Sequence, residues 1–243
     1  MEQPRIVSRD EWLAARKALL AREKAHTREG DALSVDRRRL PMVKVETPYV
    51  FDTPDGRRSL ADLFQDRSQL IVYHFMMGPG WAEGCPSCSF LMDHLDGVLP
   101  HLANRDVTLV AVSRAPLAEI DAFKRRMGWQ FPWVSSYGTA FNRDFHVSFT
   151  KDEMAKDAEY NYTVDKIPSE ELPGLSAFIR DENDKVFHTY SSYARGLDTL
   201  VGTYNFLDMA PKGRDEGALP WTMAWVRRHD EYEDKPKGGS CCA

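Results

Sequence analysis

Gly84-Cys85-Pro86-Ser87-Cys88-Ser89-Phe90 is the stretch that decides the fold, because it joins a strand-like segment to a helix-like one. Residues 69–77, just upstream, are apolar and rich in β-branched and aromatic side chains, which predicts a buried strand. Gly78-Pro79-Gly80 would end that strand. From residue 90 to 102 the apolar side chains recur at helical spacing. The two cysteines are therefore predicted to lie at a strand-to-helix junction.

The position of Cys85 indicates a reactive thiol. Pro86 suits the first position of a helix, because its missing N–H would have no intrahelical partner there. Cys85 then falls near the N-cap, where unpaired backbone N–H groups and the helix dipole favour a thiolate. A thiolate attacks disulfides, peroxides and sulfenic acids. Because Cys88 follows about one helical turn later, it can close a disulfide with Cys85, and the pair indicates a redox dithiol.

A metal site is the alternative interpretation of these cysteines. Structural zinc usually takes four ligands from paired motifs, and the sequence holds no second Cys-x-x-Cys and no His-x-x-x-His. A soft-metal site would need Cys85 and Cys88, with Cys241 and Cys242 as further candidate ligands. A disulfide between adjacent cysteines is strained, so Cys241 and Cys242 are candidates for a relay that exchanges with the dithiol. An inert terminus is the alternative for that pair, and a non-catalytic interaction module is the alternative for the whole chain.

Composition bounds the functions to consider. The sequence has 243 residues, of which 42% are hydrophobic and 28% charged, and this is typical of one large globular domain with extensions. A net charge of −5 gives no general attraction to nucleic acid or to an anionic membrane. No apolar run approaches the roughly 20 residues of a membrane span, and no signal-peptide segment opens the sequence. We therefore expect a cytoplasmic protein, in which a disulfide would be transient and catalytic.

The motifs that are absent also bear on partners. The sequence has no phosphate loop and no dinucleotide fingerprint, so we expect no bound cofactor. Reducing equivalents would then come from a thiol reductant or a reductase, and the substrate would be a protein or small-molecule disulfide.

Three regions are predicted along the chain. Residues 1–40 form an N-terminal helical extension, with a helix over about 8–30. Residues 41–226 form an α/β domain with a long polar and aromatic insertion at about 142–171. Residues 227–243 are predicted to be a mobile tail. Strands are expected at 42–51, 69–77, 107–112, 131–134, 176–179 and 185–190, and helices at 59–64, 86–102, 116–127 and 197–207. This order fits a central sheet that is flanked by helices.

The sequence resembles the thioredoxin superfamily, and it is more closely similar to a bacterial family known as domain of unknown function 899. The stretches that carry the match are Tyr73-His74-Phe75-Met76, Gly84 to Phe90, Val112-Ser113-Arg114-Ala115-Pro116, Arg126-Met127-Gly128-Trp129, Phe141-Asn142-Arg143-Asp144-Phe145 and Thr189 to Gly196. Members of that family are described as predicted dithiol-disulfide oxidoreductases. The resemblance implies a thioredoxin-like fold, with Cys85 as the nucleophile and Cys88 as the resolving thiol.

The sequence departs from related patterns at two places. Thioredoxin-like proteins place a cis-proline before the first strand of the final hairpin, where this sequence has Ser176 and its neighbours, with Pro173 slightly early. Peroxiredoxins use Pro-x-x-x-Thr-x-x-Cys, and here Gly78 and Ala82 stand at the Pro and Thr positions. A dedicated peroxidase is therefore not expected, and a low-efficiency peroxidase remains an alternative.

Five further residues are candidates for tuning the thiols or contacting the substrate. His74 lies on a core strand and Arg114 follows one, and they could reach the dithiol if the strand ends converge. Ser176 stands near the expected cis-proline position. Arg195 is a candidate anion holder, with surface ion pairing as its alternative. Trp81 lies close before Cys85, where packing is the alternative role.

Overall fold

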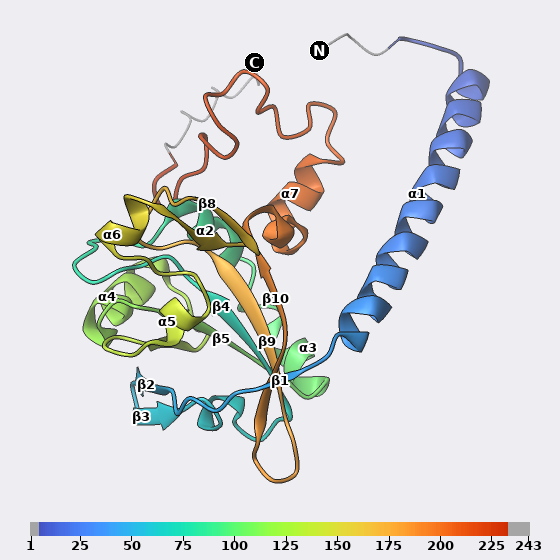
Figure 1. Cartoon of the computed structure of the whole chain (residues 1–243). Coiled ribbons are helices and arrows are strands. Elements are labelled where there is room, and N and C mark those ends of the chain that lie inside the picture. Colours follow the sequence, from blue (N-terminus) through green and yellow to red (C-terminus); the bar gives the residue numbers. More distant parts are fainter. Residues whose placement is uncertain (1–4, 233–243) are drawn as a thin grey trace, which may run out of the picture. The chain divides into compact units, whose positions relative to one another are not determined.

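The computed structural model describes residues 5–232 (Figure 1). The chain divides into two compact units, Met1–Pro41 and Met42–Ala243. The first contains helix α1 (Arg9–Arg39), which begins at a capping box formed by Ser8 and Glu11. This helix is longer than predicted, because Gly30 does not interrupt it and arginines fill its last turn, where they complement the helix dipole. No helix in residues 5–232 is long and apolar enough to cross a membrane.

The second unit is built on a mixed sheet. Its strands are β1 (Val43–Lys44), β2 (Val50–Thr53), β3 (Gly56–Ser59), β4 (Gln69–His74), β5 (Val107–Ser113), β6 (Trp133–Ser135), β9 (Gly174–Arg180) and β10 (Val186–Tyr193). They are ordered β1-β10-β9-β4-β5-β6-β2-β3 (Figure 1). β5 is parallel to both β4 and β6, whereas β9 runs antiparallel to β4 and β10. Parallel strands linked by helices, followed by an antiparallel hairpin, form a thioredoxin-like sheet, and the predicted fold is confirmed.

Helices cover both faces of this sheet. Those of the second unit are α2 (Pro86–Met92), α3 (Leu99–Asn104), α4 (Leu117–Met127), α5 (Phe141–Asp144), α6 (Lys151–Met154) and α7 (Gly202–Leu207), with 3-10 helices η1 (Asp62–Phe64) and η2 (Ala194–Leu200). Residues of α2, α4 and α7 share one apolar cluster with Tyr73 and Phe75. Residues of η1 and α5 share the other with Val72. Alternation along β4 therefore sends neighbouring side chains into different cores.

The helix predicted over 86–102 begins at Pro86 as expected, but it is not continuous, because the chain turns between α2 and α3. The carboxylate of Asp93 accepts a hydrogen bond from the Trp129 indole at 2.8 Å. The carboxylate of Asp96 accepts from the backbone N–H groups of Gln130 and Phe131, the latter at 2.7 Å. These bonds tie the α2–α3 turn to the loop before β6. Distant partners therefore end the helix where local periodicity would have continued it.

Other elements differ from their predicted form. The strand expected over 42–51 divides into β1 and β2, with Pro48, which lacks a backbone donor, between them. The helix expected over 197–207 divides into η2 and α7, and a Cβ on Gly202 would lie 3.1 Å from the His94 ring. The predicted insertion contains regular elements, namely most of α5, all of α6 and a hairpin of β7 (Asp157–Tyr160) and β8 (Thr163–Lys166).

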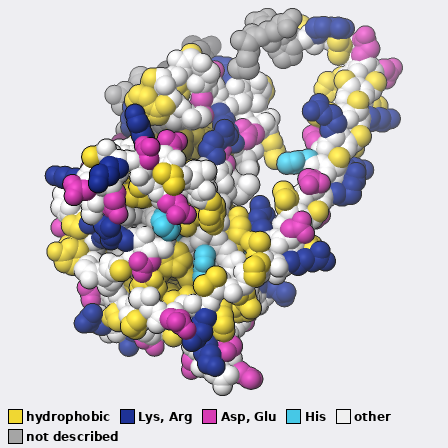
Figure 2. Space-filling model, viewed as in Figure 1, with side chains coloured by type: hydrophobic (Ala, Val, Ile, Leu, Met, Phe, Trp, Pro, Cys, Tyr) yellow, Lys and Arg dark blue, Asp and Glu magenta, His cyan; other side chains and the backbone are white. Residues whose placement is uncertain are grey.

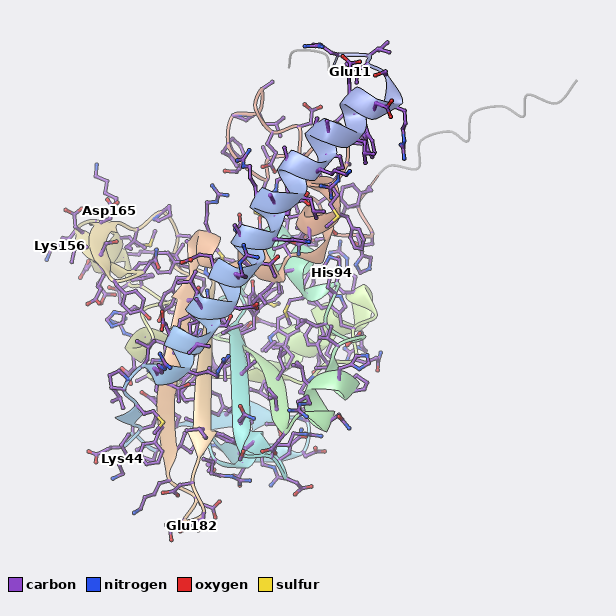
Figure 3. The ribbon with its side chains drawn as sticks, turned by 90° about the vertical axis from the view of Figure 1, so that its right-hand side faces the viewer. Glu11, Lys44, His94, Lys156, Asp165 and Glu182 are labelled. Carbon is purple, nitrogen blue, oxygen red and sulfur yellow. The ribbon has the colours of Figure 1, made fainter. Side chains whose placement is uncertain are left out.

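The two hairpins and the distribution of charged side chains can be followed in Figures 2 and 3. Figure 3 shows Glu182 at the tip of the β9–β10 hairpin, and Lys156 and Asp165 together beside the β7–β8 hairpin. Basic and acidic side chains are intermixed on the face drawn in Figure 2. That face therefore carries no extended surface of one sign of charge.

Residues 227–232 differ from the predicted tail, because they contact the α2 region of the same unit. The Arg228 side chain is only 11% exposed and donates to the carbonyl oxygen of Gly84. His229 contacts Asp93 at 2.7 Å. Hydrogen bonding to residues so far away in sequence has no local signature, and the polar composition of this segment therefore gave the wrong expectation.

Candidate dithiol site

The backbone of Cys85 is held by the end of β4 and the first turn of α2. Its N–H donates to the Met76 carbonyl at 3.1 Å, and its own carbonyl accepts from Ser89 N at 2.9 Å and Ser89 Oγ at 3.0 Å. Cys85 is the N-cap residue of α2, followed by Pro86 in the first turn. This is the local arrangement expected from the sequence, since proline is tolerated where no intrahelical N–H bond is needed.

Gly84 is required by the packing in front of Cys85. A Cβ at this position would lie 2.7 Å from the Phe123 ring and also overlap the Phe75 ring. Real side chains do not approach so closely, so any larger residue would displace an aromatic ring or the loop. The absence of a side chain lets the backbone before Cys85 lie directly against the core.

The two sulfur atoms have different environments. Cys85 is partly exposed, whereas Cys88 is only 2% exposed. A hydrogen bond with the Cys88 side chain, together with the amides of Cys88 and Ser87 and the charge of Arg228, lowers the pKa of the Cys85 thiol to about 6 against the effect of burial. Burial and the hydrogen bond with Cys85 raise the pKa of Cys88 well above its usual value. A partly exposed thiol with a lowered pKa thus lies beside a buried thiol with a raised pKa.

Tyr73 is a site residue that the sequence analysis missed. It is 2% exposed, belongs to the same apolar cluster as Cys88, and its hydroxyl is hydrogen-bonded to the Cys88 side chain. This bond acts on Cys88 in the opposite direction to burial, because it lowers the pKa of that thiol. The alternation of β4 was a usable signal: Tyr73 and Phe75 share the face that α2 covers, whereas His74 does not.

The structure places His74 and Ser176 together, on the other face of the sheet. His74 Nε2 lies 2.9 Å from Ser176 Oγ, and the imidazole packs against the rings of both Phe141 and Phe145, with centroid distances of 5.5 Å. Burial lowers the pKa of His74 to about 3, with a smaller contribution from His188. These contacts describe a neutral core histidine on the face away from Cys88, and they do not bring it to the dithiol.

Arg114 and Trp81 gather around the loop between β4 and Cys85. Arg114 Nε donates to the Glu171 carboxylate at 2.6 Å, and Glu171 is only 1% exposed. Burial raises the pKa of Glu171, with Ser148 and Arg114 acting against it. A Cβ on Gly78 would lie 3.1 Å from Trp81 Nε1 and 3.4 Å from Glu171 Oε1. This buried carboxylate, which the sequence analysis missed, fixes Arg114 beside the loop.

The remaining candidate residues lie elsewhere. The Arg195 side chain is 79% exposed and pairs with Asp198 at 3.0 Å, as in its surface interpretation. Cys241 and Cys242 lie outside the described residues. Within residues 5–232 there is no cis peptide bond and no group of three or more His, Cys, Asp or Glu side chains placed to hold a metal ion.

The fold and this pair define a class of protein, namely a thioredoxin-like protein with a Cys-x-x-Cys pair at the end of a central strand. The chain belongs to the family described as "Bacterial protein of unknown function (DUF899)", whose model matches residues 1–232. The matched region thus includes both cysteines and Arg228. The search of curated proteins found no match.

Solved structures with some similarity are peroxiredoxins. Peroxidoxin BcpB from Mycobacterium tuberculosis is 14% identical, with 68% of this chain and 95% of that chain covered and a TM-score of 0.44. A mutant of peroxiredoxin Q from Xanthomonas campestris is 15% identical, with 69% and 98% covered and a TM-score of 0.47. A yeast mitochondrial 1-Cys peroxiredoxin is 18% identical, with 70% and 78% covered and a TM-score of 0.38. At these identities and scores, nothing about the activity of this chain follows from the similarity.

Proposed function

We propose that this protein is a thiol-disulfide oxidoreductase that uses Cys85 and Cys88. The observation that carries the proposal is the unequal pair: a partly exposed Cys85 with a lowered pKa lies hydrogen-bonded to a buried Cys88 with a raised pKa. Such a difference suits two successive roles. The first thiol must be ionised and accessible, whereas the second must stay protonated and buried until the mixed disulfide has formed.

The reaction would proceed in two exchanges. The Cys85 thiolate attacks one sulfur of a substrate disulfide, forms a mixed disulfide and releases the other substrate sulfur as a thiolate, which takes up a proton. Cys88 then loses its proton and attacks Cys85, which releases the second substrate thiol. The substrate gains two electrons, and the protein is left with a Cys85–Cys88 disulfide. A thiol reductant or a reductase would return the dithiol to its reduced form.

The residues around the pair would support these steps. The Ser87 and Cys88 amides favour the Cys85 thiolate at the start, and the hydrogen bond from Tyr73 favours Cys88 as a thiolate when it attacks. Since Cys88 is buried, its deprotonation is the unfavourable step, and a donor aimed at its sulfur reduces that cost.

The test is to trap the intermediate. The Cys88→Ser variant, mixed with oxidised glutathione as the probe, should accumulate a mixed disulfide on Cys85 by mass spectrometry. The Cys85→Ser variant is the matched control, and it should form far less adduct because Cys88 is buried. An adduct mainly on Cys88, or a wild-type protein that consumes no disulfide probe, would contradict the proposal.

The two alternatives are tested on the same wild-type preparation. Faster turnover with hydrogen peroxide than with any disulfide probe would favour a peroxidase. Zinc that remains at one equivalent after dialysis, and whose removal unfolds the protein, would favour a structural metal site. A redox dithiol instead predicts two titratable thiols in the described part of the reduced protein and no metal requirement for folding.

A further inference from the structure

Residues 226–232, which we call the closing segment, contact the dithiol helix at both of its ends. Val226 is 3% exposed and belongs to the same apolar cluster as Cys88. Arg228 reaches the backbone just before Cys85, and His229 reaches Asp93 at the other end of α2. The closing segment is therefore packed against the element that carries both cysteines.

Arg228 makes the most specific of these contacts. Its Nε and Nη2 both donate to the Gly84 carbonyl oxygen, at 3.1 and 2.7 Å. Its Nη1 contacts Glu231 at 2.7 Å and Glu83 at 3.0 Å. Each of the three guanidinium nitrogens of the nearly buried Arg228 side chain thus contacts an oxygen acceptor. The planar fork of arginine suits such a site, because its donors keep a fixed geometry.

The Gly84 oxygen belongs to the peptide group that enters Cys85. At the other edge of that peptide, the Cys85 N–H donates to the Met76 carbonyl. Both polar groups of the Gly84–Cys85 peptide are consequently hydrogen-bonded. The N–H is bonded to the Met76 carbonyl just after β4, and the carbonyl oxygen is bonded to Arg228. With both atoms held, the peptide plane cannot rotate without losing hydrogen bonds, and Cys85 keeps its position at the N-cap.

We propose that Arg228 is a positioning residue of the dithiol: it fixes the peptide before Cys85 and places a positive charge next to that cysteine. The catalytic meaning of this role rests on the proposed function, whereas its geometric part does not. The consequence is that the closing segment is part of the site, although it lies beyond the final hairpin of the thioredoxin-like sheet.

The surrounding charges have to be counted, because two carboxylates also face Arg228. Glu83 and Glu231 each contact both Arg228 and Arg126, and Asp230 pairs with Arg126 at 2.7 Å. These three acidic groups against two arginines leave no net positive cluster on the surface. Only Arg228 among them bonds the Gly84 oxygen, and its charge contributes to the lowered pKa of Cys85. Arg126 shares the network without that contact, so it provides a matched control.

The experiment measures Cys85 ionisation directly. In the Cys88→Ser background, the ultraviolet absorbance of the thiolate is followed against pH for Arg228→Met, Arg228→Lys and Arg126→Met. We expect the midpoint to rise by roughly one pH unit in Arg228→Met, as for the loss of a nearby opposite charge. Arg228→Lys should shift less, because it keeps the charge but loses the fork. Arg126→Met should titrate like its parent.

A second readout uses proteins that retain Cys88. Because a stabilised Cys85 thiolate favours the reduced dithiol, Arg228→Met should lower the reduction potential and Arg126→Met should leave it unchanged. If Arg228→Met does not fold, Arg228→Lys carries both measurements. A parental midpoint and potential in the foldable Arg228 variants, or equal shifts in Arg126→Met, would overturn the proposal. A shifted midpoint in a protein that reduces no disulfide would instead overturn the proposed function alone.

Discussion

Both faces of the central sheet bury polar side chains, but the hydrogen-bonded groups on the two faces differ. On the face that α2 covers, Tyr73 is hydrogen-bonded to Cys88, and Cys88 to the partly exposed Cys85. On the opposite face, His74 is hydrogen-bonded to Ser176, which contacts Ser191, and all three are buried. The second chain continues from Ser191 Oγ to the half-buried His188 at 2.8 Å, so partial exposure is common to both. The two chains differ in the groups they hold: the first contains a pair of thiols that can form a disulfide, whereas the second contains only imidazole and hydroxyl groups.

The strongest way to break this comparison is to remove one group from each face. Cys85→Ala should lower disulfide reductase activity by roughly a thousandfold or more, as the loss of a nucleophile does. His74→Phe should keep most of the activity per folded molecule. Steady-state rates with a disulfide probe, normalised to the folded fraction, provide the measurement. Comparable losses in both variants would mean that the two faces are functionally coupled.

A second substitution tests the close packing in front of the dithiol. Gly84→Ala should destabilise the protein by roughly 1–3 kcal/mol, the usual cost of overpacking, because its Cβ would overlap Phe75 and Phe123. Gly97→Ala is the control, since no atom lies within 4 Å of the position of its Cβ. Urea denaturation of both variants gives the comparison, and equal stabilities would show that the loop adjusts without cost.

His74, on the opposite face of the sheet, should affect the stability of the protein at acid pH. The pKa of His74 falls from 6.5 to about 3 on folding, so between these values the unfolded chain binds one proton more than the folded protein. Stability from this group is therefore present above pH 6.5 and is lost as the pH falls toward 3. His74→Phe should show a shallower loss of unfolding free energy over that range. An unchanged slope would mean that other groups control acid unfolding.

A sequence-based prediction succeeds here where neighbouring residues decide the structure, and it fails where a distant residue decides it. Local signals placed β4, the turn after it, Pro86 at the helix start, and α4. They failed where a distant partner decides: at the Asp96 turn, which ends a helix, and at Arg228, which anchors a segment with polar composition. His74 is a candidate in the sequence because the end of its strand could approach the dithiol, although the alternation of β4 places its side chain on the other face.

The smallest effect is expected from the terminal cysteines. Truncation after Gly239 removes Cys241 and Cys242, and we expect slower turnover with small-thiol reductants if these residues relay electrons to Cys85. The intact Cys85–Cys88 pair should still react with the disulfide probe. Identical turnover with every thiol reductant, and no disulfide between Cys85 and the terminal cysteines by mass spectrometry, would sink the relay.

The contact between Arg228 and Gly84 joins residues 144 positions apart, and this separation has a consequence for biosynthesis. Synthesis proceeds from the N-terminus, so every strand of the central sheet leaves the ribosome before Arg228 does. While the chain is being made, the peptide before Cys85 lacks its second anchor and the thiol lacks the neighbouring positive charge. If Arg228 has the role proposed above, we expect the Cys85 thiol of a nascent chain to ionise less readily than that of the finished protein.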